Sequence, residues 1–231
     1  MARQFFKRIL RRYGLDVVTH RPFLELLQPW GIKCLLDVGA NTGQFGQELR
    51  RAGYTGTIYS FEPTKQAFAH LLNTTGADER WHAENIGFGS VSQSRQVAVA
   101  SDSQLTSMLD PLRPHPFSGS EMIRLSRLDE WLGGAEIELP RTCLKLDVQG
   151  YEKEIFSGAG QFLPQFAAVI SELAICPTYE GQPYAEDVVA FLRAHGFDLW
   201  ATRRGTWTPN GKREIERDGL FLNRATAACE P

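Results

Sequence analysis

The sequence lacks the residue patterns of a metal, redox or membrane-spanning protein. Its four cysteines include no C-x-x-C pair, so neither a zinc ribbon nor a disulfide framework is indicated, and a cytoplasmic location is expected. Its five histidines form no H-E-x-x-H motif, and we expect no metal site. No apolar run approaches the roughly 18 residues that are needed to cross a bilayer.

The sequence also lacks an excess of charge of either sign. The chain has 25 Lys and Arg against 27 Asp and Glu, a formal net charge of -2, whereas nucleic-acid-binding proteins carry a positive excess. We therefore expect no nucleic-acid partner. The local exception is the segment 1–13, which has five basic residues, no acid and apolar residues at helical spacing. It is interpreted as an amphipathic helix packed on the domain, with peripheral contact to the inner face of a membrane as the alternative.

Length and periodicity favour one α/β domain with a doubly wound, mostly parallel sheet. At 231 residues with 42% apolar content, a core of full size can form. Short apolar runs alternate with helical patterns, as in β-α units. The predicted strands are 34–38, 57–61, 81–86, 142–147, 168–173, 197–201 and 219–222. We expect a helical extension over 1–30, the domain over 31–224 and a tail over 225–231.

The stretch 90–131 does not follow this alternation. A short β-like run at 96–100 precedes a loop that contains three prolines. Long loops in compact domains are commonly functional. We expect the loop 101–124 to shape the substrate pocket, with His115 near the substrate.

A glycine turn follows the first predicted strand. The segment 36–43 reads Leu-Asp-Val-Gly-Ala-Asn-Thr-Gly, and glycines allow the backbone to turn sharply and approach a ligand closely. The lysine of a P-loop is absent, and Asn41 replaces the middle glycine of a dinucleotide fingerprint. Nucleoside triphosphates are therefore disfavoured, and an NAD-type cofactor is less favoured.

Two acids at neighbouring strand ends indicate another ligand. Asp37 ends the first strand region, and Glu62 follows the second, where an acid can accept hydrogen bonds from both ribose hydroxyls. A ligand with a positively charged amino-acid end and no phosphate matches both acids. We therefore predict S-adenosylmethionine as the cofactor. The alternative is that Asp37 caps the next helix and Glu62 is an ordinary surface acid.

Three blocks of sequence, 36–46, 61–63 and 144–152, resemble the FkbM-type methyltransferases, and the likeness runs from about residue 33 to about residue 223. The third block, Leu-Lys-Leu-Asp-Val-Gln-Gly-Tyr-Glu, is the more specific one. The resemblance implies a Rossmann-like class I methyltransferase fold, with a seven-stranded sheet whose last strand is antiparallel. It also implies O-methylation of a hydroxyl on a sugar, a surface glycan or a polyketide-type metabolite.

The resemblance also implies roles for individual residues. Those implied for the cofactor are Asp37, Gly39, Asn41 and Gly43 for the methionine end, Glu62 for the ribose, and Asn85 and Ile86 for the adenine. The segment 104–108 resembles a serine-bearing loop of the family, which places Ser107 near the substrate. Family members often have an acid where this chain has Gln149, and we assign that position no role.

Asp147 and Glu172 are the candidate catalytic residues. Each lies at the carboxyl end of a predicted strand, which faces the ligand crevice in open α/β sheets. A hydroxyl is a poor nucleophile, so a base should help by roughly 100-fold to 10,000-fold, and Asp147 is the first choice. The carboxylates could also bind Mg²⁺, which we do not favour. Structural roles remain the alternative, a helix N-cap in the case of Asp147, and Lys145 shares its strand face without an assigned role.

Two other functions stay open. A nitrogen-directed methyltransferase acting on nucleic acid or protein usually has an Asn or Asp-Pro-Pro-aromatic segment after the fourth strand, where this chain has Asp147-Val148-Gln149-Gly150. A non-catalytic module could bind the cofactor and recruit a partner through residues 1–13. The sequence does not predict an oligomeric state.

Overall fold

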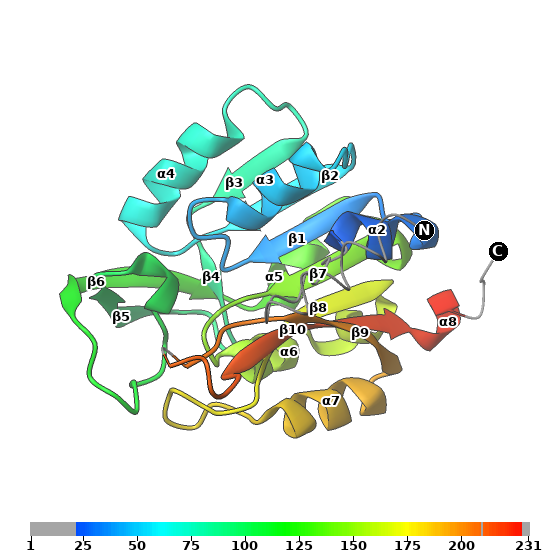
Figure 1. Cartoon of the computed structure of the whole chain (residues 1–231). Coiled ribbons are helices and arrows are strands. Elements are labelled where there is room, and N and C mark those ends of the chain that lie inside the picture. The colour runs from blue at the N-terminus through cyan, green and yellow to red at the C-terminus, as the bar shows by residue number, and fades with distance from the viewer. Residues whose placement is uncertain (1–21, 209, 228–231) are drawn as a thin grey trace, which may run out of the picture.

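The computed structural model, which describes residues 22–208 and 210–227, has at its centre a seven-stranded sheet with helices on both faces (Figure 1). The strand order is β3-β2-β1-β7-β8-β10-β9. The strands are β1 (Cys34–Val38), β2 (Thr57–Phe61), β3 (Trp81–Glu84), β7 (Thr142–Leu146), β8 (Ala168–Ala174), β9 (Phe197–Arg204) and β10 (Glu216–Asn223). β10 is antiparallel to β8 and β9, and the other pairs are parallel. The predicted sheet, with its last strand antiparallel, is confirmed.

Alternate side chains of the central strands enter two different cores. Leu36 and Val38 of β1 pack in one core with Leu144 of β7, whereas Leu35 packs with Ile58 of β2 in the other. Successive side chains of a strand point to opposite faces of the sheet. β1 is therefore buried on both faces, which explains why its residues are apolar except for Asp37.

Helices cover both faces of the sheet. They are α2 (Phe23–Leu27), α3 (Gln44–Arg51), α4 (Lys65–Thr75), α5 (Leu128–Gly133), α6 (Glu152–Ala159), α7 (Ala185–Ala194) and α8 (Arg224–Ala227). Phe23 and Leu27 of α2 are buried in the second core. The predicted basic helix over 1–13, with its membrane contact, lies outside the described residues, as does the tail end 228–231. No helix in the described ranges has the length and apolarity to span a bilayer.

A second sheet has the order β4-β6-β5. Its strands are β4 (Gly87–Phe88), β5 (Gln93–Ala100) and β6 (Phe117–Ser126). β5 contains the predicted run 96–100. β6 corrects the expectation of a loop over 101–124, because the last third of that segment pairs antiparallel with β5. Only Ile123 and Leu125 of β6 are buried, so its sequence lacks the apolar alternation that identifies a strand.

Candidate active site

A cavity of about 1080 Å³ lies at the carboxyl ends of the parallel strands. The turns after β1, β2, β7 and β8 form its wall, together with parts of the loops 102–115 and 205–215. Ligand pockets commonly measure roughly 300 to 1,000 Å³. The cavity is therefore large enough for two reactants side by side.

The glycine turn after β1 is pressed against the end of β7. Gly39 has a φ of 75°, and a Cβ placed on it would lie 2.0 Å from the carbonyl oxygen of Asp147. Its amide donates to the carbonyl oxygen of Phe61 at 3.0 Å. Only glycine suits both the left-handed backbone and the close approach. This contact brings the turn and Asp147 into one cavity wall, where Gly39, Asn41 and Asp147 are all lining residues.

Gly43 does not line the cavity. Its φ is 89°, and a Cβ there would lie 2.9 Å from Thr74 Cγ2 and 3.0 Å from Leu71 Cδ1, both on α4. The structure thus explains this glycine by its backbone conformation and by the packing against α4. The contact of Gly43 with the cofactor, which the resemblance implied, stays a prediction.

Glu62 lies in the cavity wall with both of its carboxylate oxygens already hydrogen-bonded. It is only 6% exposed. Oε2 accepts from the amide of Asn41 at 3.0 Å, and Oε1 accepts from the amide and hydroxyl of Thr64 at 2.9 and 2.5 Å. Burial raises the pKa of Glu62 above its ordinary value, and the bonds from Thr64 and Asn41 offset part of that rise.

This arrangement decides what the glycine turn can bind. In phosphate sites, free backbone amides of such a turn bind the anion. Here the amide of Asn41 is used by the protein's own Glu62 carboxylate, and a phosphate would meet that negative charge. The site therefore fits a cationic ligand that offers hydroxyl donors. A carboxylate can accept further hydrogen bonds because its two oxygens have about four lone-pair sites.

Asp37 lies beneath the cavity, not in its wall. It is fully buried, and its Oδ1 is 2.9 Å from Lys145 Nζ. The register of the parallel sheet causes this, because Asp37 lies between Ser60 of β2 and Lys145 of β7. Asp37 is thus shown as the buried partner of Lys145, and its contact with the cofactor stays a prediction. Burial raises the pKa of Asp37, and the ammonium of Lys145 lowers it in part.

Lys145 connects Asp37 to Asp147. Its Nζ is 3.5 Å from Asp147 Oδ2, and Lys145 itself lines the cavity. Burial opposes the charged form of Lys145, but Asp37 and then Asp147 outweigh burial and hold its pKa above the ordinary value. Lys145 is therefore a charged positioning residue that holds the Asp147 carboxylate.

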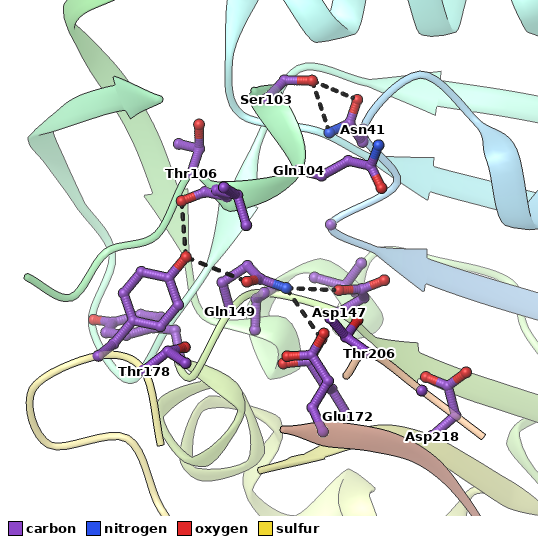
Figure 2. Close-up of a pocket in the computed structure, with 18 of the residues that line it drawn as sticks. Asn41, Ser103, Gln104, Thr106, Asp147, Gln149, Glu172, Thr178, Thr206 and Asp218 are labelled. Atoms are coloured by element: carbon purple, nitrogen blue, oxygen red, sulfur yellow. Dashed lines mark hydrogen bonds between the residues drawn. The ribbon is translucent and has the colours of Figure 1, made fainter. Parts of the chain in front are cut away.

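Gln149 joins the two predicted catalytic acids, although the sequence assigned it no role. Its Nε2 donates to Glu172 Oε2 at 3.0 Å and is 3.4 Å from Asp147 Oδ1. Its Oε1 accepts from the Tyr179 hydroxyl at 3.2 Å (Figure 2). The backbone of Gln149 is left-handed, with a φ of 53°. One signal in the sequence indicated a role of Gln149, which is its place in the block 144–152 that resembles the family most specifically. Its partners Tyr179 and Glu172 are distant in the sequence, so their contacts with Gln149 could not be predicted.

Glu172 is buried beside other acids. It is 8% exposed, and its Oε1 receives no hydrogen bond from the described residues. Burial raises its pKa well above the ordinary value, and Asp147 and Glu216 raise it further. Asp218 lies opposite Glu172 in the β8–β10 pair, and burial followed by Asp147 raises its pKa to about 6. The described side chains include no group of three or more metal-ligating residues arranged to hold an ion.

Two loops meet over the cavity and form a roof, defined here as residues 102–116 and 175–182. The amide of Leu112 donates to the carbonyl oxygen of Thr178 at 2.8 Å, and the amide of Glu180 donates to that of Asp110 at 2.8 Å. These bonds are between backbone groups. They hold the two loops together whatever their side chains are.

The roof is also tied to the cavity wall. Ser103 Oγ accepts from Asn41 Nδ2 at 3.0 Å and donates to Asn41 Oδ1 at 3.1 Å (Figure 2). Ser107, predicted near the substrate, instead donates from its hydroxyl to the carbonyl oxygen of Gln149 at 2.7 Å and does not line the cavity. His115 does line it, with its ring 4.7 Å from that of Phe117. The roof therefore brings His115 to the cavity and uses Ser107 as a tether.

The residues implied for the adenine lie outside the cavity wall. β3 ends at Glu84, short of the predicted 81–86. The Asn85 amide donates to the carbonyl oxygens of Glu62 and Pro63 at 2.9 and 3.0 Å, and Ile86 is buried in the first core. Neither lines the cavity, where Gly87 and Phe88 lie instead. The chain turns into β4 at this point, which moves the lining positions two residues along.

Comparison with protein families gives one match. The model described as "Methyltransferase FkbM domain" matches residues 37–199, which include the glycine turn, Glu62, Asp147 and Glu172. A search of the curated proteins finds no match.

Solved structures are similar in fold. TehB from Haemophilus influenzae has a TM-score of 0.51 at 9% identity, covering 93% of this chain and 65% of its own. Sp1610 from Streptococcus pneumoniae, a proposed tRNA (m1A22) methyltransferase, has a TM-score of 0.50 at 12% identity, covering 89% of this chain and 71% of its own. At these identities the similarity shows the fold alone, which is the class I methyltransferase fold.

Proposed function

Because the chain belongs to the FkbM family of S-adenosylmethionine-dependent methyltransferases, we propose that it methylates a hydroxyl of a sugar, a surface glycan or a polyketide-type metabolite. One observation carries the proposal. The contact between Gly39 and the Asp147 carbonyl oxygen places a base candidate in the same wall as the glycine turn. The acid needed for a hydroxyl acceptor is thus beside the segment that would hold the methyl donor.

The residues present fit the cofactor. Glu62 and the turn 39–41 would hold it, because an acidic wall without a phosphate site suits a ligand with positive charge and ribose hydroxyls. When bound, S-adenosylmethionine supplies a methyl group on a positively charged sulfur, which is already activated for transfer. The chain then has to position the acceptor, exclude water and remove one proton.

Asp147 is the proposed base. Its carboxylate is held from two sides, by Lys145 Nζ at 3.5 Å from Oδ2 and by Gln149 Nε2 at 3.4 Å from Oδ1. In a transfer that forms the O–CH3 bond, breaks the S–CH3 bond and releases S-adenosylhomocysteine, Asp147 would take the hydroxyl proton of the acceptor. Such a base contributes roughly 100-fold to 10,000-fold. Glu172 lies farther along the sheet and faces the acceptor.

The test is methyl transfer from radiolabelled S-adenosylmethionine to separate panels of saccharides, polyketide-type alcohols, bulk RNA and protein. We expect label in a hydroxyl compound, with the O-methyl group identified by NMR. Label in RNA or protein alone would overturn the proposal in favour of a nitrogen-directed enzyme. Cofactor binding by calorimetry without transfer to any panel would favour the non-catalytic module.

A further inference from the structure

The acceptor end of the cavity, defined here by Glu172, Glu216 and Asp218, brings three carboxyl groups together. Glu172 is on β8, and the other two are on the neighbouring strand β10. Asp218 lies directly opposite Glu172 in the antiparallel register, an arrangement that is destabilising for like charges. All three line the cavity together with Asp147. Four carboxyl groups thus face one space.

Two of the cations that line the cavity, Lys145 and Arg203, are already in ion pairs. Lys145 Nζ lies 2.9 Å from Asp37 Oδ1 and 3.5 Å from Asp147 Oδ2. Arg203 lies 3.7 Å from Asp218 but is closer to Glu48, at 2.6 Å. Among the side chains that the structure describes, no ammonium or guanidinium lies within ion-pair distance of Glu172 or Glu216. These two acids have no counterion from the described chain.

Glu172 is incompletely satisfied as well as uncompensated. More than nine-tenths of it is buried, Oε2 accepts from Gln149 Nε2, and Oε1 receives no hydrogen bond from the described residues. On the other side, the carboxyl group of Glu216 lies within side-chain hydrogen-bond reach of Glu172, and two carboxylate oxygens need a proton or a shared donor between them to bond. Removing an unpaired carboxylate from water is costly. Figure 2 shows Glu172 turned toward the same space as Asp147, with Gln149 between them.

We propose that the acceptor is an amino alcohol, such as an amino sugar, whose protonated amine binds between Glu172 and Glu216. This inference rests on the proposed O-methylation. Asp147 and Glu172 both reach the single amide nitrogen of Gln149, at 3.4 and 3.0 Å. The hydroxyl that gives its proton to Asp147 and the amine held by Glu172 are therefore close together on the acceptor. An ammonium group supplies both the charge and the hydrogen-bond donors that this end lacks.

The position in the sheet separates this subsite from the cofactor. Glu62 and the glycine turn belong to β1 and β2, on one side of β7, whereas the acceptor end belongs to β8 and β10 on the other. Asp147, which follows β7, lies between them. A neutral polyol would leave Glu172 and Glu216 facing each other without a counterion.

The experiment compares matched ligand pairs, each an amino sugar and its hydroxyl counterpart, such as glucosamine and glucose. Binding is measured by calorimetry to the full chain saturated with S-adenosylhomocysteine. We expect at least one amine to bind about tenfold or more tightly than its neutral partner, because an ammonium group forms charge-assisted hydrogen bonds that a hydroxyl cannot form. Glu172→Gln and Glu216→Gln should each reduce that preference to about threefold or less.

Glu180→Gln is the matched control. It removes the same charge from an exposed roof position that does not line the cavity, and it should keep the full preference. If no amine in the panel is preferred, or if both acceptor-end variants retain the preference, the inference is overturned. Failure to bind S-adenosylhomocysteine would instead count against the proposed function, so the two failures are distinguishable.

Discussion

The two ends of the cavity treat their buried carboxyl groups differently. At the cofactor end, Glu62 accepts hydrogen bonds on both oxygens from Asn41 and Thr64. At the acceptor end, Glu172 accepts one from Gln149, and its Oε1 receives none from the described residues. The first end takes its donors from the protein alone, whereas at the second the described chain gives Glu172 one donor and places the carboxyl group of Glu216 beside it. A buried acid can thus be part of a finished site or the part that a ligand completes.

Asp147 stands between the two ends, and its replacement should have the largest effect. Asp147→Asn keeps the size of the side chain but removes the base, so methyl transfer should fall by roughly 100-fold to 10,000-fold. Single-turnover transfer from radiolabelled S-adenosylmethionine measures this. Cofactor affinity should stay within about threefold. A parallel loss of cofactor binding would show that Asp147 belongs to the cofactor end, and Asp110→Asn in the exposed roof is the control.

Replacing Gly39, whose contact with Asp147 holds the two ends together, should have the second largest effect. Gly39→Ala places a Cβ 2.0 Å from the Asp147 carbonyl oxygen, and the free energy of unfolding should fall by about 3 kcal/mol or more. Gly53→Ala is a matched control, since its φ is 98° but nothing lies within 4 Å of the added Cβ. It should cost only about 1 kcal/mol. Equal losses in urea unfolding would mean that the contact does not restrain the wall.

The cofactor end should depend on Glu62 and be independent of the acceptor. Glu62→Gln removes a charged acceptor, and we expect the Kd for S-adenosylmethionine to rise by about 10-fold to 100-fold. Calorimetry measures this change. Glu84→Gln, at the end of β3, alters an acid that bonds Trp131 and does not line the cavity, and it should leave the Kd unchanged. The same Kd in both variants would remove Glu62 from the site.

The smallest effect concerns stability at the acceptor end. The pKa of Glu172 is raised in the folded protein, so the native state binds more protons, and stability falls as pH rises from the unfolded value of 4.5 through the raised one. Glu172→Gln lacks this decline. The difference in the free energy of unfolding between Glu172→Gln and the unaltered chain should therefore shift in favour of the variant from about pH 5 to about pH 8.

Urea unfolding at both pH values checks this shift. Glu152, with its pKa near 7, and Asp218, with its pKa near 6, are raised in the same direction but are present in both proteins. The difference between the two proteins in how the free energy of unfolding depends on pH therefore reports the contribution of Glu172. Parallel curves would mean that Glu172 is compensated in the folded chain, and the contrast between the two ends would disappear.

The same contrast governs what the sequence could predict. The strands 34–38 and 57–61 were predicted with their observed bounds, because a strand buried on both faces is a short apolar run with clear ends. β6 was missed because only Ile123 and Leu125 are buried and three prolines precede it. Strands that are buried on both faces could be predicted from the sequence. A strand that is defined mainly by pairing with a distant strand could not.

The site follows the same rule. Glu62 could be placed at the end of a strand from its local sequence alone, whereas its hydrogen bond with Asn41, 21 residues away, was not predicted. The role of Gln149 depends on Glu172 and Tyr179, which are 23 and 30 residues away. Asp37 was expected in the cavity, but its ion pair with Lys145 forms only when β1 and β7 become neighbours. Residues whose partners come from distant strands needed the structure.

The roof has a consequence for how acceptor preference can change in evolution. Its two loops are joined by main-chain bonds, from Leu112 to Thr178 and from Glu180 to Asp110. Substitutions at these four positions exchange side chains without removing the bonds that join the two loops, whereas Ser103 and Ser107 tie the roof to the wall through their side chains. At Leu112 and Thr178, which line the cavity, the side chain can contact the acceptor, while the main chain joins the two loops. A descendant of this enzyme can therefore acquire a new substrate and keep its architecture.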